Sequence, residues 1–175
     1  MSKILVTGGT GLLGSHLLIR LINENKNDEI YALYRNKNKI DLLYQLGHCY
    51  EISADILRSI KWVEGDICIY EDMCKLFETG IDYVYHCAAN VSFERSERRK
   101  LYMINVEGSR LIVDMSLEYG VKKLCYVSSV GALGRDSDKG IIDENSTFDV
   151  KGDSSYYSFT KYMGELEVWR GIAEG

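Results

Sequence analysis

Proline is absent from all 175 residues, although average proteins contain roughly 5% of it. The chain also has no run of about 20 apolar residues, the length needed to span a bilayer. Its N-terminus shows no signal-peptide pattern. We therefore expect a soluble, cytoplasmic protein without a membrane partner.

Metal-binding and disulfide patterns are lacking as well. The cysteines are odd in number, and no two of them form a C-x-x-C pair. The histidines do not have the spacing of metal ligands. The sequence thus indicates neither a disulfide framework nor a zinc site, and most cysteines are expected to be small core residues. The residues concerned are Cys49, Cys68, Cys74, Cys87, Cys125, His16, His48 and His86.

An excess of positive charge is missing too. The formal net charge is -5, which argues against a protein that wraps nucleic acid. A local basic run of Arg95, Arg98, Arg99 and Lys100 is explained by a solvated helix start. With 46% hydrophobic residues the chain can bury a real core, and its length fits one domain over residues 1–175.

Strand and helix signals alternate along the chain, with no internal repeat and no low-complexity linker. Helices are expected from Leu12 to Ile22, over parts of 36–59, from Ile69 to Phe77, from Glu97 to Tyr119 and from near Ser155. The alternation predicts an α/β fold with a doubly wound parallel sheet, the Rossmann fold. The expected strands are Lys3–Thr7, Glu29–Tyr34, Lys61–Glu64, Tyr83–His86 and Lys123–Ser128.

The first expected strand runs directly into a turn that has almost no side chains and opens a helix. The turn reads Gly8-Gly9-Thr10-Gly11-Leu12-Leu13-Gly14. Bare N–H groups and the positive end of the helix dipole then face the place where a dinucleotide pyrophosphate binds. The string fits both G-x-G-x-x-G and G-x-x-G-x-x-G, so spacing alone does not choose between dinucleotide-binding families. A second strand within one β-α-β length favours binding over a turn with glycines for packing only.

The residues after the second expected strand indicate which dinucleotide binds. NAD-binding units place an acidic residue there for the ribose hydroxyls, whereas NADP-binding units have an arginine nearby for the 2′-phosphate. Here Tyr34 is followed by Arg35, with Lys37 and Lys39 close behind. The sequence therefore favours NADP(H) and leaves NAD(H) as the alternative. A solvated basic loop is the purely structural explanation that stays open.

Tyr157 and Lys161 lie four residues apart on the last expected helix and so share a face, where the ammonium can reach the phenol. An adjacent cation favours the phenolate, which makes a tyrosine a usable proton donor or acceptor in carbonyl reduction. A chain with this number of tyrosines and lysines is expected to contain about one Tyr-x-x-x-Lys motif by chance. Tyr119 and Lys123 also have it, but Gly120 splits them between a helix end and a strand.

Two serines, Ser128 and Ser129, end the fifth expected strand. The carboxyl edge of a parallel sheet places such side chains over a bound cofactor, where a hydroxyl can donate to a substrate carbonyl oxygen. A cap on the neighbouring backbone explains paired serines equally well.

Taken together, these motifs resemble those of the extended short-chain dehydrogenase/reductases, and the resemblance covers essentially the whole chain. This family includes dihydroflavonol-reductase-like enzymes and nucleotide-sugar epimerases and dehydratases. Arg35 after Tyr34 is closer to the NADP-using, dihydroflavonol-reductase-like branch. The motifs that carry the resemblance are Thr7 to Gly14, Gly65-Asp66-Ile67, His86-Cys87-Ala88-Ala89, Asn105-Val106-Glu107-Gly108, Val127 to Gly134, and Tyr157 with Lys161.

The resemblance implies a role for each motif. Ser129, Tyr157 and Lys161 would form a catalytic triad, and Asn105 would be a structural and proton-relay residue. Asp66 would hold the adenine. No metal is implied. The cofactor-binding residues that the resemblance implies are Gly8, Thr10, Gly11, Leu12, Leu13, Gly14, Arg35, Asp66, Ile67, Ala88, Ala89, Tyr157 and Lys161.

The reaction implied by the resemblance is reduction of a small-molecule carbonyl by hydride transfer from NADPH. Tyr157 would pass the proton, while Lys161 would favour the phenolate and hold the nicotinamide ribose. Ser129 would hydrogen-bond the reacting oxygen, and Asn105 would support a water relay. A nucleotide-sugar epimerase or dehydratase with retained NAD(P) is one alternative, and a non-catalytic NADP-sensing or partner-binding protein is another. The substrate and the oligomeric state, a homodimer included, are left open.

The chain stops where its last expected helix ends, before the sixth strand of the six-stranded form of this fold. Together with the absence of proline, this predicts an N-terminal fragment of a longer enzyme, inactive by itself, without its last strand and substrate-binding region. The outer edge of the fifth strand would then be unpaired.

Overall fold

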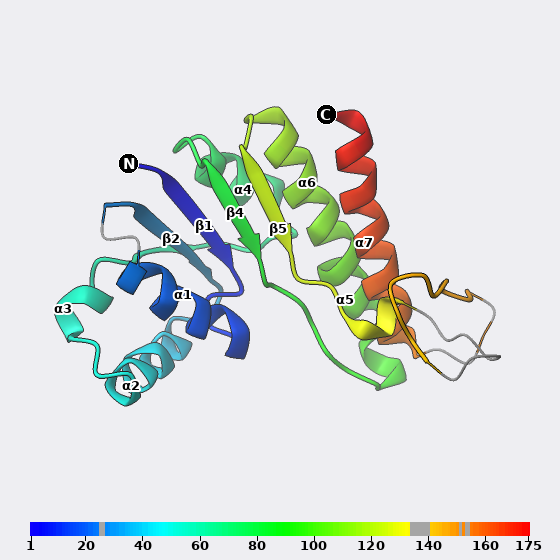
Figure 1. Ribbon diagram of the computed structural model, residues 1–175, viewed down its shortest axis with the longest axis horizontal. Helices are drawn as coiled ribbons and strands as arrows, with labels where there is room; N and C mark the ends of the chain where they lie inside the picture. The colour runs from blue at the N-terminus through cyan, green and yellow to red at the C-terminus, as the bar shows by residue number, and fades with distance from the viewer. Residues whose placement is uncertain (25–26, 134–140, 151, 153–154) are drawn as a thin grey trace.

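The computed structural model describes residues 1–24, 27–133, 141–150, 152 and 155–175. The centre of this part of the chain is a five-stranded parallel sheet in the order β3-β2-β1-β4-β5 (Figure 1). The chain moves outward from β1 to β3 and then crosses to the other side of β1, so the switch point of this doubly wound sheet lies between β1 and β4. The predicted fold class is confirmed. The strands are β1 Lys3–Thr7, β2 Glu29–Tyr34, β3 Lys61–Glu64, β4 Tyr83–His86 and β5 Lys123–Tyr126.

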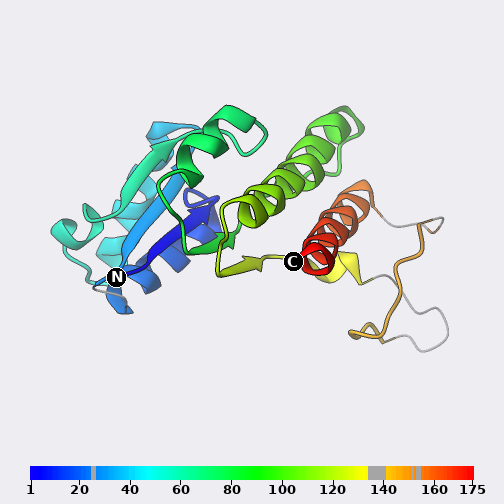
Figure 2. The same ribbon diagram turned by 90° about the horizontal axis from the view of Figure 1, so that it is seen from above.

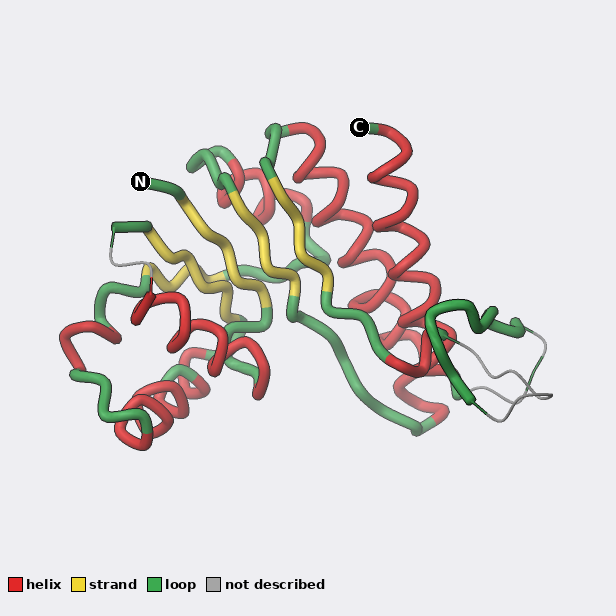
Figure 3. The backbone as a smooth tube through the Cα atoms, in the orientation of Figure 1, coloured by secondary structure: helices red, strands yellow, loops and turns green. Residues whose placement is uncertain are grey.

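The parallel register brings the carboxyl ends of the strands to one edge, where the arrowheads point in Figure 1, and Figure 3 shows the same strands in yellow. At this edge Thr7 of β1 pairs with His86 of β4, and His86 pairs with Tyr126 of β5. The loops that leave β1, β2 and β4 therefore start close together.

The helices alternate with the strands. The segment expected as one helix from Glu97 to Tyr119 is helical throughout most of its length, but five residues within it, Met103–Glu107, form a π turn. The helices are α1 Leu12–Glu24, α2 Asp41–Cys49, α3 Ala54–Leu57, α4 Tyr70–Phe77, α5 Arg98–Tyr102, α6 Gly108–Glu118 and α7 Tyr156–Glu174, with short 3-10 turns at Lys37–Lys39, Arg95–Glu97 and Val130–Ala132.

Alternate side chains of the strands face two separate cores, because successive side chains of a strand point to opposite faces of the sheet. Leu5 of β1 packs with Met73 and Phe77 of α4 and with Ile112 of α6. The residues on either side of it, such as Val6, pack with α1 and α3 in the second core; its buried residues are Ile4, Val6, Leu18, Ile19, Leu21, Ile22, Ile30, Ala32, Leu43, Leu57 and Ile60. Figure 2 shows the helices on the two sides of the sheet.

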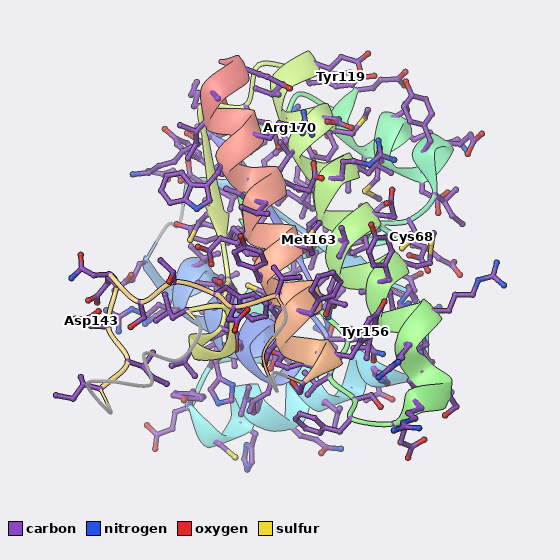
Figure 4. The ribbon with its side chains drawn as sticks, turned by 90° about the vertical axis from the view of Figure 1, so that its right-hand side faces the viewer. Cys68, Tyr119, Asp143, Tyr156, Met163 and Arg170 are labelled. Carbon is purple, nitrogen blue, oxygen red and sulfur yellow. The ribbon has the colours of Figure 1, made fainter. Side chains whose placement is uncertain are left out.

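The last helix, α7, runs beside α6 (Figures 1 and 4). Arg170 of α7, labelled in Figure 4, donates to Asp114 of α6 at 2.5 Å. Two glycines let the helix approach closely: a Cβ at Gly171 would lie 2.5 Å from Val113 Cγ1, and a Cβ at Gly164 would collide with the carbonyl oxygen of Asn105. Close packing thus ties α7 to both α6 and the π turn.

One strand ends earlier than the sequence suggests. β5 ends at Tyr126, two residues before Ser128, although the N–H of Val127 still donates to the His86 carbonyl at 3.1 Å. Gly134, which ends the motif around Ser129, lies outside the described residues. Within the described ranges, no helix has the length and apolar character that a bilayer span requires.

Candidate functional site

The loop after β1 is built from glycines where side chains would collide. Gly8 has a φ of +68°, and a Cβ there would lie 2.7 Å from the backbone nitrogen of Ala88. A Cβ at Gly14 would collide with the carbonyl oxygen of Gly8, which also accepts the N–H of Gly11 at 2.9 Å. The N–H groups in the first turn of α1 have no intrahelical acceptor, so the helix N-terminus is suited to bind an anion. The loop is therefore shaped for phosphate.

A cavity of about 450 Å³ opens at this edge of the sheet. It extends from the glycine loop to the loop after β2 on one side and the loop after β4 on the other, and its volume is in the range of roughly 300–1,000 Å³ typical of ligand pockets. Seven predicted cofactor-binding residues line it: Gly8, Thr10, Gly11, Arg35, Ile67, Ala88 and Ala89. Its other lining residues are Leu33, Tyr34, Asn36, Lys39, Gly65, Cys87 and Ile104.

Arg35 and Asp66 meet at the β2 end of the cavity. Nη1 of Arg35 lies 3.4 Å from Oδ2 of Asp66, and 57% of the arginine side chain is exposed. Asp66 is held by its own turn, because its Oδ1 accepts the N–H of Cys68 at 3.0 Å and its N–H donates to Asp72 at 2.9 Å. An exposed pair of this kind contributes little to stability. The guanidinium is thus free to serve a phosphate, and Lys39 adds a second cation to the cavity wall.

Lys161 is a buried cation at the end of β5. Only 2% of the residue is exposed, and its Nζ donates to Tyr126 Oη and to the Val127 carbonyl, both at 2.8 Å. Burial lowers the pKa of Lys161 to about 8. The ammonium also lies 4.3 Å from the centroid of the Tyr126 ring. Burial raises the pKa of Tyr126, so this phenol stays neutral beside the lysine.

Tyr157 is oriented differently from the prediction that the Lys161 ammonium contacts its phenol. Within the described residues, both hydrogen bonds of the Lys161 Nζ go to the β5 end, because a buried ammonium turns to fixed acceptors that satisfy it. The Tyr157 ring packs edge-on against Phe93, with centroids 6.1 Å apart. The Tyr157 hydroxyl has no hydrogen-bond partner among the described side chains, so it is open to a substrate oxygen.

Ser129 combines a backbone cap with a free donor. Its Oγ accepts the N–H of Gly131 at 3.2 Å and caps the short turn Val130–Ala132. Its hydroxyl proton has no acceptor in the part of the chain that the structure describes. Ser128 differs, because its hydroxyl donates to Glu165 of α7. Of the two serines, Ser129 is the one able to donate to a ligand.

Asn105 joins three segments through its side-chain amide. Its Oδ1 accepts the N–H of Asn90 at 2.7 Å, while its Nδ2 donates to the Asn90 carbonyl at 2.9 Å and to Thr160 Oγ1 at 3.0 Å. Only 1% of Asn105 is exposed. The π turn is thereby fastened both to the loop after β4 and to α7. With all its amide groups engaged, Asn105 fits a positioning role.

Six predicted cofactor-binding residues do not line the cavity: Leu12, Leu13, Gly14, Asp66, Tyr157 and Lys161. The side chains of Leu12 and Leu13 are exposed, 83% and 52% respectively, and Gly14 serves the close approach of α1 to the loop. These three residues offer a phosphate the backbone N–H groups of the first helical turn.

The predicted site residues thus form two groups at one sheet edge, the cavity wall and a second group of Ser129, Tyr157 and Lys161. Two hydrogen bonds connect the groups, since Lys161 donates to the Val127 carbonyl and Val127 donates to the His86 carbonyl. Both groups therefore depend on the ends of β4 and β5.

Three residues of the site escaped reasoning from the sequence: Tyr126, Asn90 and Thr160. None of them has a spacing or composition that marks it, because each is defined by a partner far away in the chain. Tyr126 lies two residues before the paired serines that the sequence singled out, but its bond to Lys161 becomes visible only once the burial of that lysine is known.

A parallel sheet with a glycine-walled anion site at its switch point defines a dinucleotide-binding protein. The residues present fit such a ligand, because the positions nearest the loop have no room for a Cβ and the cavity runs from the loop to exposed cations. In a bound dinucleotide, Gly8 and Gly11 would be the residues nearest the pyrophosphate, and Arg35 would be available at the other end of the cavity.

The chain belongs to the NAD dependent epimerase/dehydratase family, whose model matches residues 4–175. The predicted resemblance to extended short-chain dehydrogenase/reductases is thereby confirmed. A "putative dihydroflavonol 4-reductase" of Synechocystis is 30% identical over 97% of this chain, and the human dTDP-D-glucose 4,6-dehydratase is 34% identical over 95% of it. The chain covers 45% of each of these relatives, so it spans about half the length of the curated relatives it matches.

Solved structures agree with the fold. A UDP-glucose 4-epimerase from Thermotoga maritima, solved with UDP-glucose, superimposes with a TM-score of 0.77 at 26% sequence identity. The match covers 98% of this chain and 52% of that structure.

Proposed function

We propose that this chain is the dinucleotide-binding part of an NADPH-dependent carbonyl reductase of the extended short-chain type. The observation that carries the choice of cofactor is Arg35. It follows β2 directly, lines the cavity and has a largely exposed guanidinium, whereas an NAD-binding unit has an acidic side chain at the end of this strand. Lys39 on the same wall supports the choice, because a 2′-phosphate adds negative charge at this place.

When bound, a nicotinamide cofactor supplies the exchange of hydride with the substrate carbon. The chain's own residues supply the proton and hold the oxygen. Tyr157 has a free hydroxyl that can give a proton to the substrate oxygen. Ser129 has a free hydroxyl proton that can donate to the same oxygen and stabilise the negative charge that develops there.

Two further residues hold this arrangement in place. Lys161 places its ammonium at the carboxyl end of β5. In the proposed reaction this positive charge stabilises the negative charge that develops when Tyr157 gives up its proton. Asn105 fixes the loop after β4 relative to α7, the helix that carries Tyr157. A water relay through Asn105 would require one of its amide bonds to open.

A fluorescence titration of NADPH and NADH against the full-length protein tests the cofactor choice. NADPH is expected to bind more tightly, and Arg35→Asp is expected to weaken NADPH by about 1–3 kcal/mol, the value of a charge-assisted hydrogen bond and its neighbouring charge. Lys37→Asp is the matched control, because Lys37 belongs to the same basic segment and is not among the residues that line the cavity. Tighter binding of NADH to the unmodified protein would overturn the proposal.

A nucleotide-sugar epimerase or dehydratase with a retained cofactor is the second candidate. Its support is the relatedness of the chain to dTDP-D-glucose 4,6-dehydratase and its likeness to a UDP-glucose 4-epimerase. The two candidates differ in their consumption of cofactor. Net oxidation of NADPH during turnover supports the reductase, whereas a changed sugar with no net consumption supports the epimerase or dehydratase.

A further inference from the structure

Four buried residues form a continuous row of hydrogen bonds between the glycine loop and the π turn. Thr7 Oγ1 lies 2.7 Å from His86 Nδ1, and His86 Nε2 lies 3.0 Å from Ser109 Oγ. Ser109 donates in turn to the Asn105 carbonyl at 2.8 Å. None of the four is more than 1% exposed, so each polar group depends on its partner within the protein.

The chemistry at one end of the row fixes the position of every proton in it. The single proton of the Ser109 hydroxyl goes to the Asn105 carbonyl, so toward His86 this hydroxyl can only accept. Nε2 of His86 must then carry the ring proton. A neutral imidazole offers Nδ1 as an acceptor, so the Thr7 hydroxyl donates to it. The oxygen of Thr7 accepts the N–H of Ala88 at 3.2 Å. Each group in the row therefore donates toward the Asn105 carbonyl, from Ala88 through Thr7, His86 and Ser109.

The burial of His86 agrees with a neutral ring. Burial is the main cause that lowers the pKa of His86 to about 3, and the charge of Lys161 lowers it further. No carboxylate takes part in the row, so nothing in it favours an imidazolium.

The row joins the cavity wall to the elements that carry the second group of site residues. At one end, Thr7 precedes Gly8 and bonds to Ala88, and both of these residues line the cavity. At the other end, Asn105 holds Asn90 and α7. His86 does not line the cavity, so any effect it has on a ligand passes through these partners.

We propose that His86 is a positioning residue of the dinucleotide site, held as the neutral Nε2–H tautomer, which sets the Thr7–Ala88 wall against the π turn through Ser109. The inference rests on the proposed function only for the identity of the dinucleotide. An apolar side chain of the same volume would leave the buried Thr7 hydroxyl proton without its acceptor and the Ser109 oxygen without the N–H donor of His86.

The tautomer can be observed directly. Long-range ¹H–¹⁵N spectra of the full-length protein are expected to show His86 with a protonated Nε2 and a bare Nδ1, at pH 6 as at pH 8. The signals that disappear in the His86→Gln variant identify this ring. A protonated Nδ1, or an imidazolium at pH 6, would overturn the inference.

The positioning effect is tested by two serines of α6. Ser109→Ala removes the acceptor of the Nε2–H and is expected to weaken NADPH binding about tenfold, within the usual range of coupling between sites. Ser116→Ala is the matched control, because Ser116 is also buried on α6 and its hydroxyl donates to a carbonyl four residues earlier, Ile112, at 2.6 Å. Equal affinities of the two variants would contradict a positioning role for the row.

Failure of the proposed function has a different signature. Full-length protein that binds neither NADPH nor NADH refutes the proposed function, and the tautomer of His86 then still decides whether the row exists as described.

Discussion

At the scale of single residues, Lys161 combines a positive charge with almost complete burial. Its ammonium is satisfied by a neutral phenol and a carbonyl instead of a carboxylate. A buried ammonium without a paired anion costs stability, and its pKa falls because the neutral amine is easier to bury. A residue that destabilises the protein in this way is typical of a functional site.

The stability of the protein is expected to depend on pH through Lys161. Its folded pKa of about 8 lies below the ordinary value of 10.5, so between these values the unfolded chain binds more protons and unfolding becomes less favourable as the pH rises. Relative to Lys161→Met, the unmodified protein should gain up to about 3 kcal/mol in unfolding free energy between pH 7 and pH 10.5. Chemical denaturation at several pH values measures this difference.

If the unfolding free energies of the unmodified protein and of Lys161→Met changed equally with pH, the lowered pKa of Lys161 would be contradicted. Lys122→Met is the control, because Lys122 is an exposed surface lysine whose pKa is raised by its ion pair with Asp82, the opposite direction.

At the scale of elements, the π turn is the junction of the site. Its Asn105 side chain bonds both the loop after β4 and α7, and its Asn105 carbonyl accepts from Ser109 and lies against Gly164. π turns inside α-helices are frequent at functional sites.

Removal of the Asn105 amide is expected to loosen this junction. Asn105→Ala leaves the N–H and carbonyl of Asn90 without partners and should lower the unfolding free energy by about 2–4 kcal/mol, since each buried unsatisfied group costs about 1–3 kcal/mol. Thr160→Val removes only one of the three bonds and should cost about 1 kcal/mol. Denaturant unfolding measures both, and hydrogen exchange at the Asn90 amide should accelerate only in the first variant. Equal losses in the two variants would show that the bonds to Asn90 contribute nothing.

At the scale of the whole molecule, the site depends on elements from both halves of the chain. The cavity wall comes from the ends of β1, β2 and β4, whereas Ser129 and Tyr157 come from the region after β5 and from α7. In the proposed function, the first group binds the dinucleotide and the second group transfers the proton. The proposal therefore predicts that substitutions separate the two roles.

Tyr157→Phe should therefore lose most of the turnover while NADPH still binds. In the full-length enzyme we expect the rate to fall at least about 100-fold, the usual contribution of a positioned general acid, with little change in the NADPH dissociation constant. Steady-state kinetics and a fluorescence titration provide the two measurements. Tyr156→Phe is the matched control. The Tyr156 ring packs against the Arg98 guanidinium and the Phe159 ring, and Tyr156 has no role in the proposed chemistry.

Wild-type rates in Tyr157→Phe would remove Tyr157 from the proposed mechanism. A protein that turns over no carbonyl, but forms a partner complex controlled by the redox state of the cofactor, would instead favour the non-catalytic alternative.

The sequence by itself determined the fold class, the order of the elements and the glycine loop. These depend on local signals: the alternation of apolar runs, the helix period after Leu12, and glycines where backbone segments approach closely. Gly8 and Arg35, which line the cavity, were predicted from the glycine loop and from the residue that follows the second strand, whereas Ala88 was expected only from the family resemblance.

Only the tertiary structure decided the partners of the buried polar groups. Lys161 shares a helix face with Tyr157, yet its ammonium bonds to Tyr126 and Val127 at the end of a strand about 35 residues away. The row through His86 likewise joins residues 79 and 23 positions apart. Burial forces each such group to find a partner, but the choice of partner depends on which elements pack together, and spacing along the chain does not record that.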